Sequence, residues 1–186
     1  MKPILFSTPM VQAILEGRKT QTRRVITPEP GTHNNDGTII SNVPPCGFLH
    51  WINKAPYQPD DILWVRETWQ RCRDDEFCYF VDELINNVTY IDEDDEPLKW
   101  KPSIHMPRAA ARIFLRVTDV RVERLQDISI EDCYSEGISI EKHECGCPVQ
   151  EITTYKKLWD SINAKRGYGW DTNPWVWVYE FEKVGR

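Results

Sequence analysis

The closing segment of the chain constrains the fold more than any other feature. Residues 175–182 run Trp-Val-Trp-Val-Tyr-Glu-Phe-Glu, so aromatic side chains occupy every second position. Because side chains alternate across a strand, this pattern predicts a β-strand with one aromatic face. We expect most of these rings in the core, and those near Trp175 are candidates to line a base-binding pocket. Apolar or alternating runs predict further strands at 62–66 and 113–122, and a hairpin over 77–91.

Three segments predict helices. The first begins with an N-cap at Thr8 and ends at Gly17. The second begins at a capping box of the Asp type in residues 129–132. The third begins at Thr153 or Thr154 and carries apolar residues at helical spacing. Strands with so few helices between them exclude a doubly wound sheet and predict an α+β fold, a small antiparallel or mixed barrel with two or three flanking helices.

Length and composition predict one globular domain over residues 1–186. The chain is 40% hydrophobic and 28% charged, and it carries eight Trp. A proline-rich loop insertion is expected at about 28–60, which holds six prolines. No apolar run is long enough for a membrane span or, at the N-terminus, for a signal peptide. We therefore expect a cytoplasmic protein whose six cysteines are free thiols.

The closest approach to a metal motif lies at His143, Cys145 and Cys147. The two cysteines are separated by one residue, and no second pair stands at a zinc-site spacing. We expect a turn here, and neither a metal nor another cofactor.

The net charge of −6 argues against a non-specific binder of duplex nucleic acid. Acidic residues concentrate at 74–76 and 92–96, whereas basic residues collect at 17–24 and again at 99–124. The stretch 17–24, Gly-Arg-Lys-Thr-Gln-Thr-Arg-Arg, directly follows the first predicted helix. We expect it to present a basic, hydroxyl-rich loop. The alternative is a solvated charge run without function.

Four residues of this stretch, Gly17, Lys19, Thr22 and Arg24, match the pattern G-x-K-x-x-T-x-R. The chain thereby resembles the ASCH family of PUA-like β-barrels, and residues 59–69 and 169–178 resemble it too. The resemblance implies a PUA-like small barrel. Characterised small bacterial members are amidohydrolases that remove the acetyl group from N4-acetylcytidine, and others are implicated in RNA binding or cleavage. The insertion at 28–60 is absent from the smallest amidohydrolases.

Lys19, Thr22 and Glu136 are the candidate catalytic residues. A desolvated lysine beside other cations loses basicity, so Lys19 could serve as a general base near neutral pH. Thr22 would be the group that it activates, unless Lys19 activates water directly. Glu136 falls in the last turn of the second predicted helix, where the helix dipole disfavours an anion. The resemblance implies that a glutamate at this place acts with the lysine and the threonine.

Other residues are candidates for substrate binding. Tryptophans can stack on a base, cations can hold an anion or a base, and strand ends often carry site residues. Two prolines should keep residues 101–108 extended, in a segment that resembles a loop of phage-type members. The candidates are Arg23, Arg24, Glu67, Trp69, Trp51, His105 and Arg108.

Three interpretations of the function follow. In the first, the pocket recognises a nucleobase or modified nucleoside, and Lys19 helps to hydrolyse an amide on it. In the second, the same cations hold phosphate in a non-catalytic RNA-binding module. In the third, the chain is a phage or prophage accessory protein that acts through protein contacts at its acidic loops. Whether the chain is an enzyme therefore stays open at this point.

Overall fold

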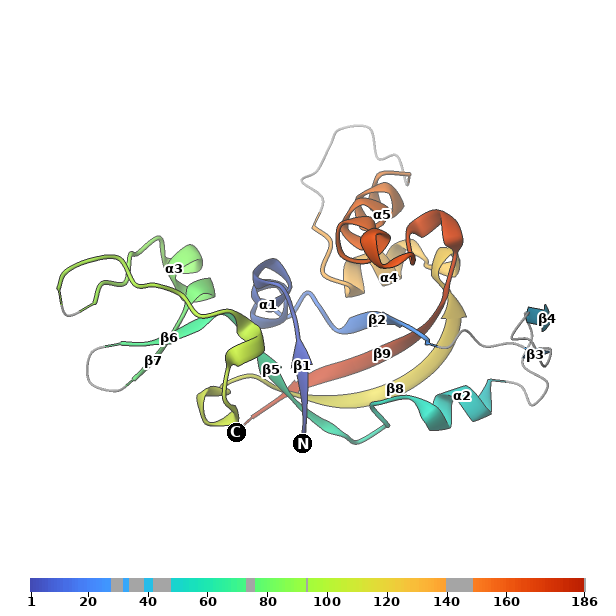
Figure 1. Cartoon of the computed structure of the whole chain (residues 1–186), viewed down its shortest axis with the longest axis horizontal. Coiled ribbons are helices and arrows are strands. Elements are labelled where there is room, and N and C mark those ends of the chain that lie inside the picture. Colours follow the sequence, from blue (N-terminus) through green and yellow to red (C-terminus); the bar gives the residue numbers. More distant parts are fainter. Residues whose placement is uncertain are drawn as a thin grey trace. The chain divides into compact units, whose positions relative to one another are not determined.

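The computed structural model describes residues 1–27, 32–33, 39–41, 48–72, 76–92, 94–139 and 149–185. The chain forms two compact units. Unit 1 comprises Met1–Arg18, Asp61–Arg116 and Glu182–Arg186, and unit 2 comprises Lys19–Asp60 and Val117–Phe181. The boundary between them falls inside the two longest strands, β8 and β9 (Figure 1).

The described part of the chain mixes strands and helices, so the α+β class is confirmed. The strands are β1 (Lys2–Leu5), β2 (Gln21–Val25), β3 (Thr32–His33), β4 (Ile39–Ser41), β5 (Ile62–Arg66), β6 (Trp69–Arg71), β7 (Phe77–Tyr79), β8 (Phe114–Arg124) and β9 (Trp175–Val184). The α-helices are α1 (Thr8–Leu15), α2 (Leu49–Lys54), α3 (Phe80–Asn86), α4 (Ile130–Ser135) and α5 (Val149–Asn163). These five exceed the two or three that the sequence predicted.

Five strands pair in the order β1-β5-β8-β9-β2, and β3-β4 and β6-β7 form two-stranded sheets. The order has β1 and β2 at its ends, so the pairing among the described strands does not close a barrel. None of the described helices combines the length and apolar character that a membrane span requires.

In unit 1, β1 pairs in parallel with β5, and β5 pairs antiparallel with the first residues of β8. Helix α1 packs against α3. The N-cap of α1 is Ser7 rather than the predicted Thr8, which is the first helical residue, and Gly17 follows the helix end with a φ of 77°. A left-handed residue at this place is typical of a helix C-terminus, and glycine adopts it without steric cost.

The predicted hairpin over residues 77–91 is wrong. Strand β7 pairs with the preceding β6, and the chain then turns into α3. Two acidic residues, Asp82 and Glu83, lie in the first turn of α3, and Asn87 ends it in the left-handed conformation at φ 50°. Acidic residues at a helix N-terminus and asparagine at its C-terminus both favour this helix over a strand.

The prediction that all cysteines are free thiols is also wrong. Cys72 and Cys78 form a disulfide, with a Cα–Cα distance of 5.9 Å. The pairing of β6 with β7 sets Gln70 opposite Cys78, which brings the two cysteines within bonding reach across the hairpin. Cys133 is free and buried.

Residues 101–108 are not extended throughout as predicted. Two short 3-10 turns, Ser103–His105 and Arg108–Ala110, each follow a proline at the N-cap. The prolines exclude an α-helix interior but not the start of a helical turn, where no N–H donor is needed.

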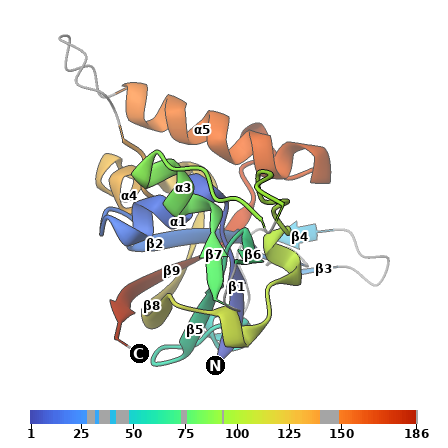
Figure 2. The ribbon, with the colours of Figure 1, turned by 90° about the vertical axis from the view of Figure 1, so that its left-hand side faces the viewer.

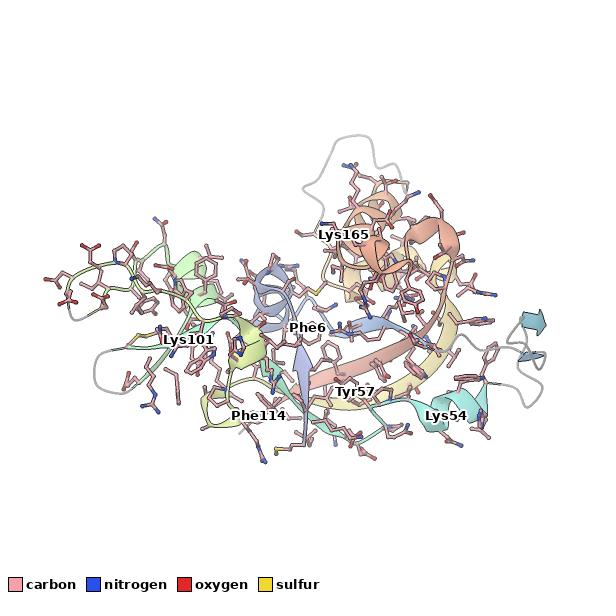
Figure 3. The ribbon with its side chains drawn as sticks, viewed as in Figure 1. Phe6, Lys54, Tyr57, Lys101, Phe114 and Lys165 are labelled. Carbon is pink, nitrogen blue, oxygen red and sulfur yellow. A yellow bond between two sulfur atoms is a disulfide. The ribbon has the colours of Figure 1, made fainter. Side chains whose placement is uncertain are left out.

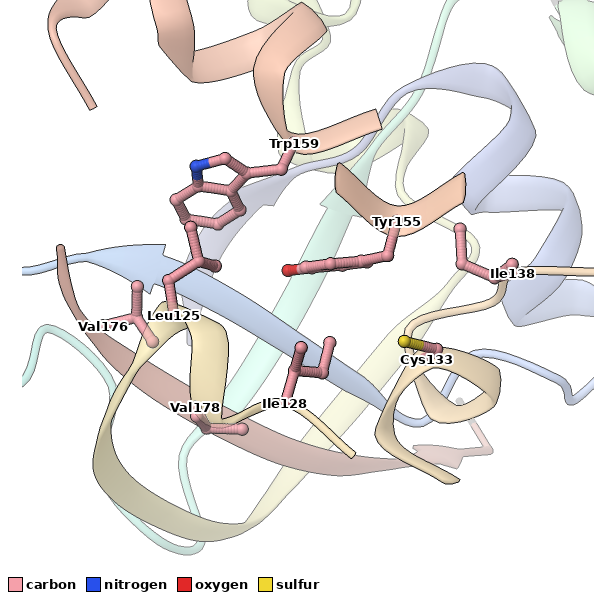
Figure 4. Packing of buried hydrophobic residues seen from close by; sticks show 8 residues of the cluster. All are labelled: Leu125, Ile128, Cys133, Ile138, Tyr155, Trp159, Val176 and Val178. Atoms are coloured by element: carbon pink, nitrogen blue, oxygen red, sulfur yellow. The ribbon is translucent and has the colours of Figure 1, made fainter. Parts of the chain in front are cut away.

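Unit 2 is organised around β2 and β9, which pair antiparallel with Thr22 opposite Tyr179 and Arg24 opposite Trp177. Helices α4 and α5 pack against each other, as Figure 2 shows. Eight buried residues of this unit form its core, with Val176 and Val178 from β9 (Figure 4): Leu125, Ile128, Cys133, Ile138, Tyr155, Trp159, Val176 and Val178. The aromatic side chains that alternate with these valines on β9 are buried as well, as predicted.

Three predictions about unit 2 need correction. The basic stretch 17–24 is a loop only in its first half, because β2 begins at Gln21 and hydrogen-bonds to β9 along its length. Helix α5 begins at Val149, before the predicted cap at Thr153 or Thr154. The segment 28–60 contains a helix, α2, among its described residues, and the rest of that predicted loop lies partly outside them.

Candidate functional site

The edge strand β2 separates the basic stretch into two sets of side chains. The ladder with β9 starts before β2, where the N–H of Phe181 donates to the Thr20 carbonyl at 2.8 Å. Because side chains alternate along a strand, Lys19, Gln21 and Arg23 fall on one face. This face meets α4, since Lys19 and Arg23 both contact Glu136.

Lys19 and Glu136 form a buried ion pair, although 117 positions separate them in the sequence. Lys19 Nζ lies 2.7 Å from Glu136 Oε2, and the side chains are 0% and 3% exposed. The same amine donates to the backbone carbonyls of Glu136 at 2.8 Å and of Gln21 at 2.7 Å. Glu136 is the C-cap of α4, as the sequence analysis placed it. A helix C-terminus disfavours an anion, and the ion pair with Lys19 explains why a carboxylate is found there.

Arg23 joins this pair to a wider network of charges. Its NH1 lies 3.4 Å from Glu136 Oε1, and its NH2 lies 3.1 Å from Glu123 and 2.8 Å from Asp132. Arg121 on β8 contacts Glu123, Glu180, Asp132 and Gln21. Three cations therefore face four carboxylates, and Arg23 is fully enclosed among them.

Burial lowers the pKa of the Lys19 amine, because it penalises the charged form. The charge of Glu136 opposes this effect, and the nearby charges of Arg24 and Arg23 add to it. Burial works to raise the pKa of Asp132, but the charge of Arg23 and the hydrogen bonds from Ser129, Gln21 and Arg23 together outweigh it, and the pKa is lowered. The loss of basicity that we expected for Lys19 is thus confirmed in direction and in its causes.

Thr22 and Arg24 fall on the other face of β2. Residues directly opposite each other in an antiparallel pair share a face, so Thr22 lies beside Tyr179 and Arg24 beside Trp177. Thr22 is buried and Arg24 is half-buried. The structure brings Lys19 and Glu136 together, and it does not bring Thr22 to their face.

Trp51 belongs to α2 and is half-buried. Its backbone carbonyl accepts a hydrogen bond of 3.0 Å from Trp177 Nε1, and Lys54 lies over its ring at 5.2 Å. Tyr57, shown after α2 and near Lys54 in Figure 3, packs edge-on against Tyr179 at 5.1 Å. The residues of this segment thus cover the aromatic face of β9 within unit 2.

The remaining candidates lie in unit 1. Glu67 is buried and accepts two hydrogen bonds from Arg112, and Trp69 is buried against Phe77. His105 and Arg108 are exposed in the two 3-10 turns. These four residues therefore do not belong to the unit that holds Lys19 and Glu136.

The sequence analysis missed four charged members of the network: Arg121, Glu123, Asp132 and Glu180. Asp132 was noticed only as part of the capping box, which the structure confirms. Arg121 sits in the predicted strand 113–122 and Glu123 directly follows it, at alternate positions of β8, which is the spacing of one strand face. That spacing was the available signal, although it does not say what the face meets.

The metal candidates His143, Cys145 and Cys147 lie outside the described residues. Within the part of the chain that is described, no group of three or more His, Cys, Asp or Glu side chains could hold a metal ion.

No family model matches the chain, and a search of curated proteins finds no match either. Among solved structures, the chain is similar to a DUF984 protein, EF3133 from Enterococcus faecalis V583, with 10% identity and a TM-score of 0.47 over 99% of this chain and 76% of that one. It is also similar to an ASCH domain from Lactobacillus crispatus JV V101, with 9% identity and a TM-score of 0.45 over 100% of this chain and 81% of that one. ASCH is the family whose motif the sequence carries. The function is argued below from the motif and the site alone.

Proposed function

We propose that the chain hydrolyses an amide on an N-acylated nucleoside, with the Lys19–Glu136 pair as its acid–base centre. The observation that carries the proposal is the 2.7 Å contact between Lys19 of the ASCH-like motif and Glu136, in a buried setting. Burial lowers the pKa of Lys19, which favours the neutral amine that a general base needs.

The proposed reaction uses one water molecule. The neutral Lys19 amine accepts a proton from the water as its oxygen bonds to the acyl carbon. The bond from the acyl carbon to the base nitrogen then breaks, and Glu136 passes the proton from the Lys19 ammonium to that nitrogen. The products are a carboxylic acid and the free amino group. Water is the nucleophile in this proposal because Thr22 lies on the other face of β2.

The charge balance of the network supports an uncharged substrate over a phosphate-bearing one. Lys19, Arg23 and Arg121 are each paired with carboxylates, and the four carboxylates outnumber them. The three cations are already paired with carboxylates, whereas RNA binding depends on cations that neutralise phosphate. This favours the nucleoside hydrolase over the RNA-binding module.

The aromatic face of β9 belongs to the same unit. Trp177 and Tyr179 lie opposite Arg24 and Thr22, and the Trp51 backbone carbonyl accepts a hydrogen bond from Trp177. This is the other face of β2 from Lys19, so none of these residues is assigned to the reacting amide in this proposal. Arg24 and Trp51 stay candidates for substrate binding, because aromatic rings stack on a base whatever its identity.

Two structural expectations also stay proposals: that the sheet forms part of a PUA-like barrel, and that the two units are one domain. A single calorimetric unfolding transition with equal calorimetric and van't Hoff enthalpies would support one domain.

The test is a screen of purified protein against N-acetylated cytidines and adenosines, as nucleosides and within short RNAs, read by mass spectrometry. We expect turnover of an acylated nucleoside. The variant Lys19→Arg keeps the positive charge but loses the amine that can deprotonate, so kcat should fall about 100- to 10,000-fold with little change in KM. Lys156→Arg is the matched control, because Lys156 forms an exposed ion pair with Asp171 at 2.9 Å.

An active Lys19→Arg enzyme would remove Lys19 from the role of base. Tight binding of acylated RNA with no turnover would instead favour the RNA-binding module. No turnover and no binding of any acylated nucleoside by the folded protein would contradict both.

A further inference from the structure

The structure assigns Arg23 a positioning role: it holds the Glu136 carboxylate against Lys19 and ties it to the start of α4. This inference rests on the proposed function and goes beyond the motif, in which Arg23 occupies an unspecified position. The sequence suggested instead that Arg23 binds substrate.

The two oxygens of Glu136 are held by different residues. Oε2 faces Lys19 Nζ at 2.7 Å, and Oε1 faces Arg23 NH1 at 3.4 Å. A carboxylate held at only one oxygen can rotate about its side-chain bonds. Contact at both oxygens fixes the orientation in which Glu136 meets the lysine amine.

Arg23 also holds the helix that carries Glu136. Its NH2 lies 2.8 Å from Asp132, whose side chain accepts a hydrogen bond from the Ser129 N–H in the capping box of α4. Helix α4 has only six residues, too few to be stable without tertiary contacts. Arg23 therefore contacts carboxylates from both ends of α4 and sets where Glu136 sits.

The contacts of Arg23 favour a positioning role over substrate binding. Its side chain is 0% exposed, and its terminal nitrogens point at Glu136, Asp132 and Glu123. Its remaining donor, Nε, is buried as well. A planar guanidinium can reach several carboxylates at once, whereas a lysine amine acts as a single point charge.

The charge of Arg23 also affects the pKa of Lys19, the proposed general base. The charged groups that bear on Lys19 are Glu136 at the end of α4, and Arg24 and Arg23 on β2. Tyr155 on α5 faces Glu136 and Arg23, and its pKa is raised well above the ordinary value by burial. Since the charge of Arg23 helps to lower the pKa of Lys19, its removal should raise that pKa.

The experiment compares Arg23→Met, Arg23→Gln and Arg23→Lys with the wild type. We expect both neutral variants to lower kcat about 10- to 100-fold, the cost of a misplaced catalytic group, with KM changed less than about threefold. The rising limb of the pH profile of kcat should move to higher pH in both. Arg23→Lys should recover part of kcat and leave that limb in place. Arg116→Met is the matched control, since Arg116 pairs with Glu182 at the surface.

A merely structural role would lower the melting temperature without moving the pH profile, and that result would overturn the inference. So would a KM increase of tenfold or more at unchanged kcat, which would return Arg23 to substrate binding. If Arg23→Met does not fold, Arg23→Gln gives the same readout, because its amide can still hydrogen-bond a carboxylate.

A second readout keeps this inference separate from the proposed function. The Lys19 amine can be titrated by NMR in protein labelled with 13C at lysine Cε, whether or not any substrate turns over. A higher pKa of Lys19 in the neutral variants supports the positioning role even in an inactive protein. An unchanged pKa of Lys19 in a folded neutral variant contradicts it.

Discussion

Each compact unit contains a cluster of buried charge. Both clusters pair a cation with Asp or Glu side chains, and they differ in the cation at their centre. In unit 1, Arg112 faces Glu67 and Asp82. In unit 2, Lys19 faces Glu136, with Arg23 behind it. The comparison matters because an arginine stays protonated in proteins, whereas a buried lysine changes its charge readily.

The unit 1 cluster is built to stay fixed. Arg112 donates to both oxygens of Glu67 at 3.0 and 2.9 Å and to both oxygens of Asp82 at 2.7 and 2.9 Å. Its guanidinium lies 3.8 Å from the centre of the Tyr79 ring. Burial works to lower the pKa of Arg112, but the hydrogen bonds to Glu67 and Asp82 outweigh it and the pKa is raised.

The difference teaches where proton transfer can take place. The contacts of Arg112 are structural, because its guanidinium keeps its charge near neutral pH. The Lys19 cluster contains a cation whose pKa is lowered by burial. Buried charge alone therefore does not mark a catalytic site, and in our proposal the identity of the cation distinguishes the two clusters.

Removing Arg112 should have the largest effect on stability. Arg112→Met leaves Glu67 buried and unpaired, which should lower the free energy of unfolding by about 3–5 kcal/mol. The double variant Arg112→Met with Glu67→Gln removes the charge as well and should recover part of the loss. Urea denaturation followed by circular dichroism measures both. A loss under about 1 kcal/mol in the single variant would show that this cluster is not the fixed one.

Removing the disulfide should have a smaller effect. Cys72 and Cys78 are 6 positions apart, and closing so short a loop contributes about 2 kcal/mol through the unfolded chain. Replacing both with serine should lower the free energy of unfolding by about that amount or less. Because the bond lies in unit 1, kcat for an acylated nucleoside should not change. A matched loss of kcat in the folded double variant would contradict the assignment of the chemistry to unit 2.

The pH dependence of stability should also sharpen the comparison. The pKa of Lys19 is lowered in the folded chain, so between that lowered value and its ordinary value near 10.5 the unfolded chain binds the extra proton. Stability from this group should then rise with pH up to that value, by at most about 1.4 kcal/mol per pH unit. Arginine does not titrate there, so Lys19→Arg should lack this rise. Urea titrations of both proteins between pH 7 and 10 measure the difference, and parallel curves would count against a lowered pKa of Lys19.

Much of the fold could be predicted from local patterns. The aromatic alternation of residues 175–181 correctly predicted strand β9 and the burial of its aromatic side chains. The capping box at Ser129 correctly predicted the start of α4. Both signals are local, because they depend only on side chains within the strand or at the helix terminus. The predicted hairpin near Asn86 failed because short apolar runs do not distinguish a strand from a helix.

The candidate site, too, could be predicted only in part from the sequence. The motif residue Lys19 and its proposed partner Glu136 could be named from the sequence, together with the loss of basicity that burial causes. Their contact could not be derived from spacing, because it depends on α4 folding back onto β2 over 117 positions. The face of Thr22 and the enclosure of Arg23 likewise depend on the register between β2 and β9.

The sequence by itself determined some of the elements, such as β9 and α4, and which residue types are able to do chemistry, because helix caps, alternation and side-chain acidity are local properties. Only the tertiary structure decided that Arg23 contacts Glu136, and that Glu67 pairs with Arg112 in the other unit. The physical reason is burial. A charge removed from water must find a partner within a few ångströms, and which partner lies there is a property of the packed chain.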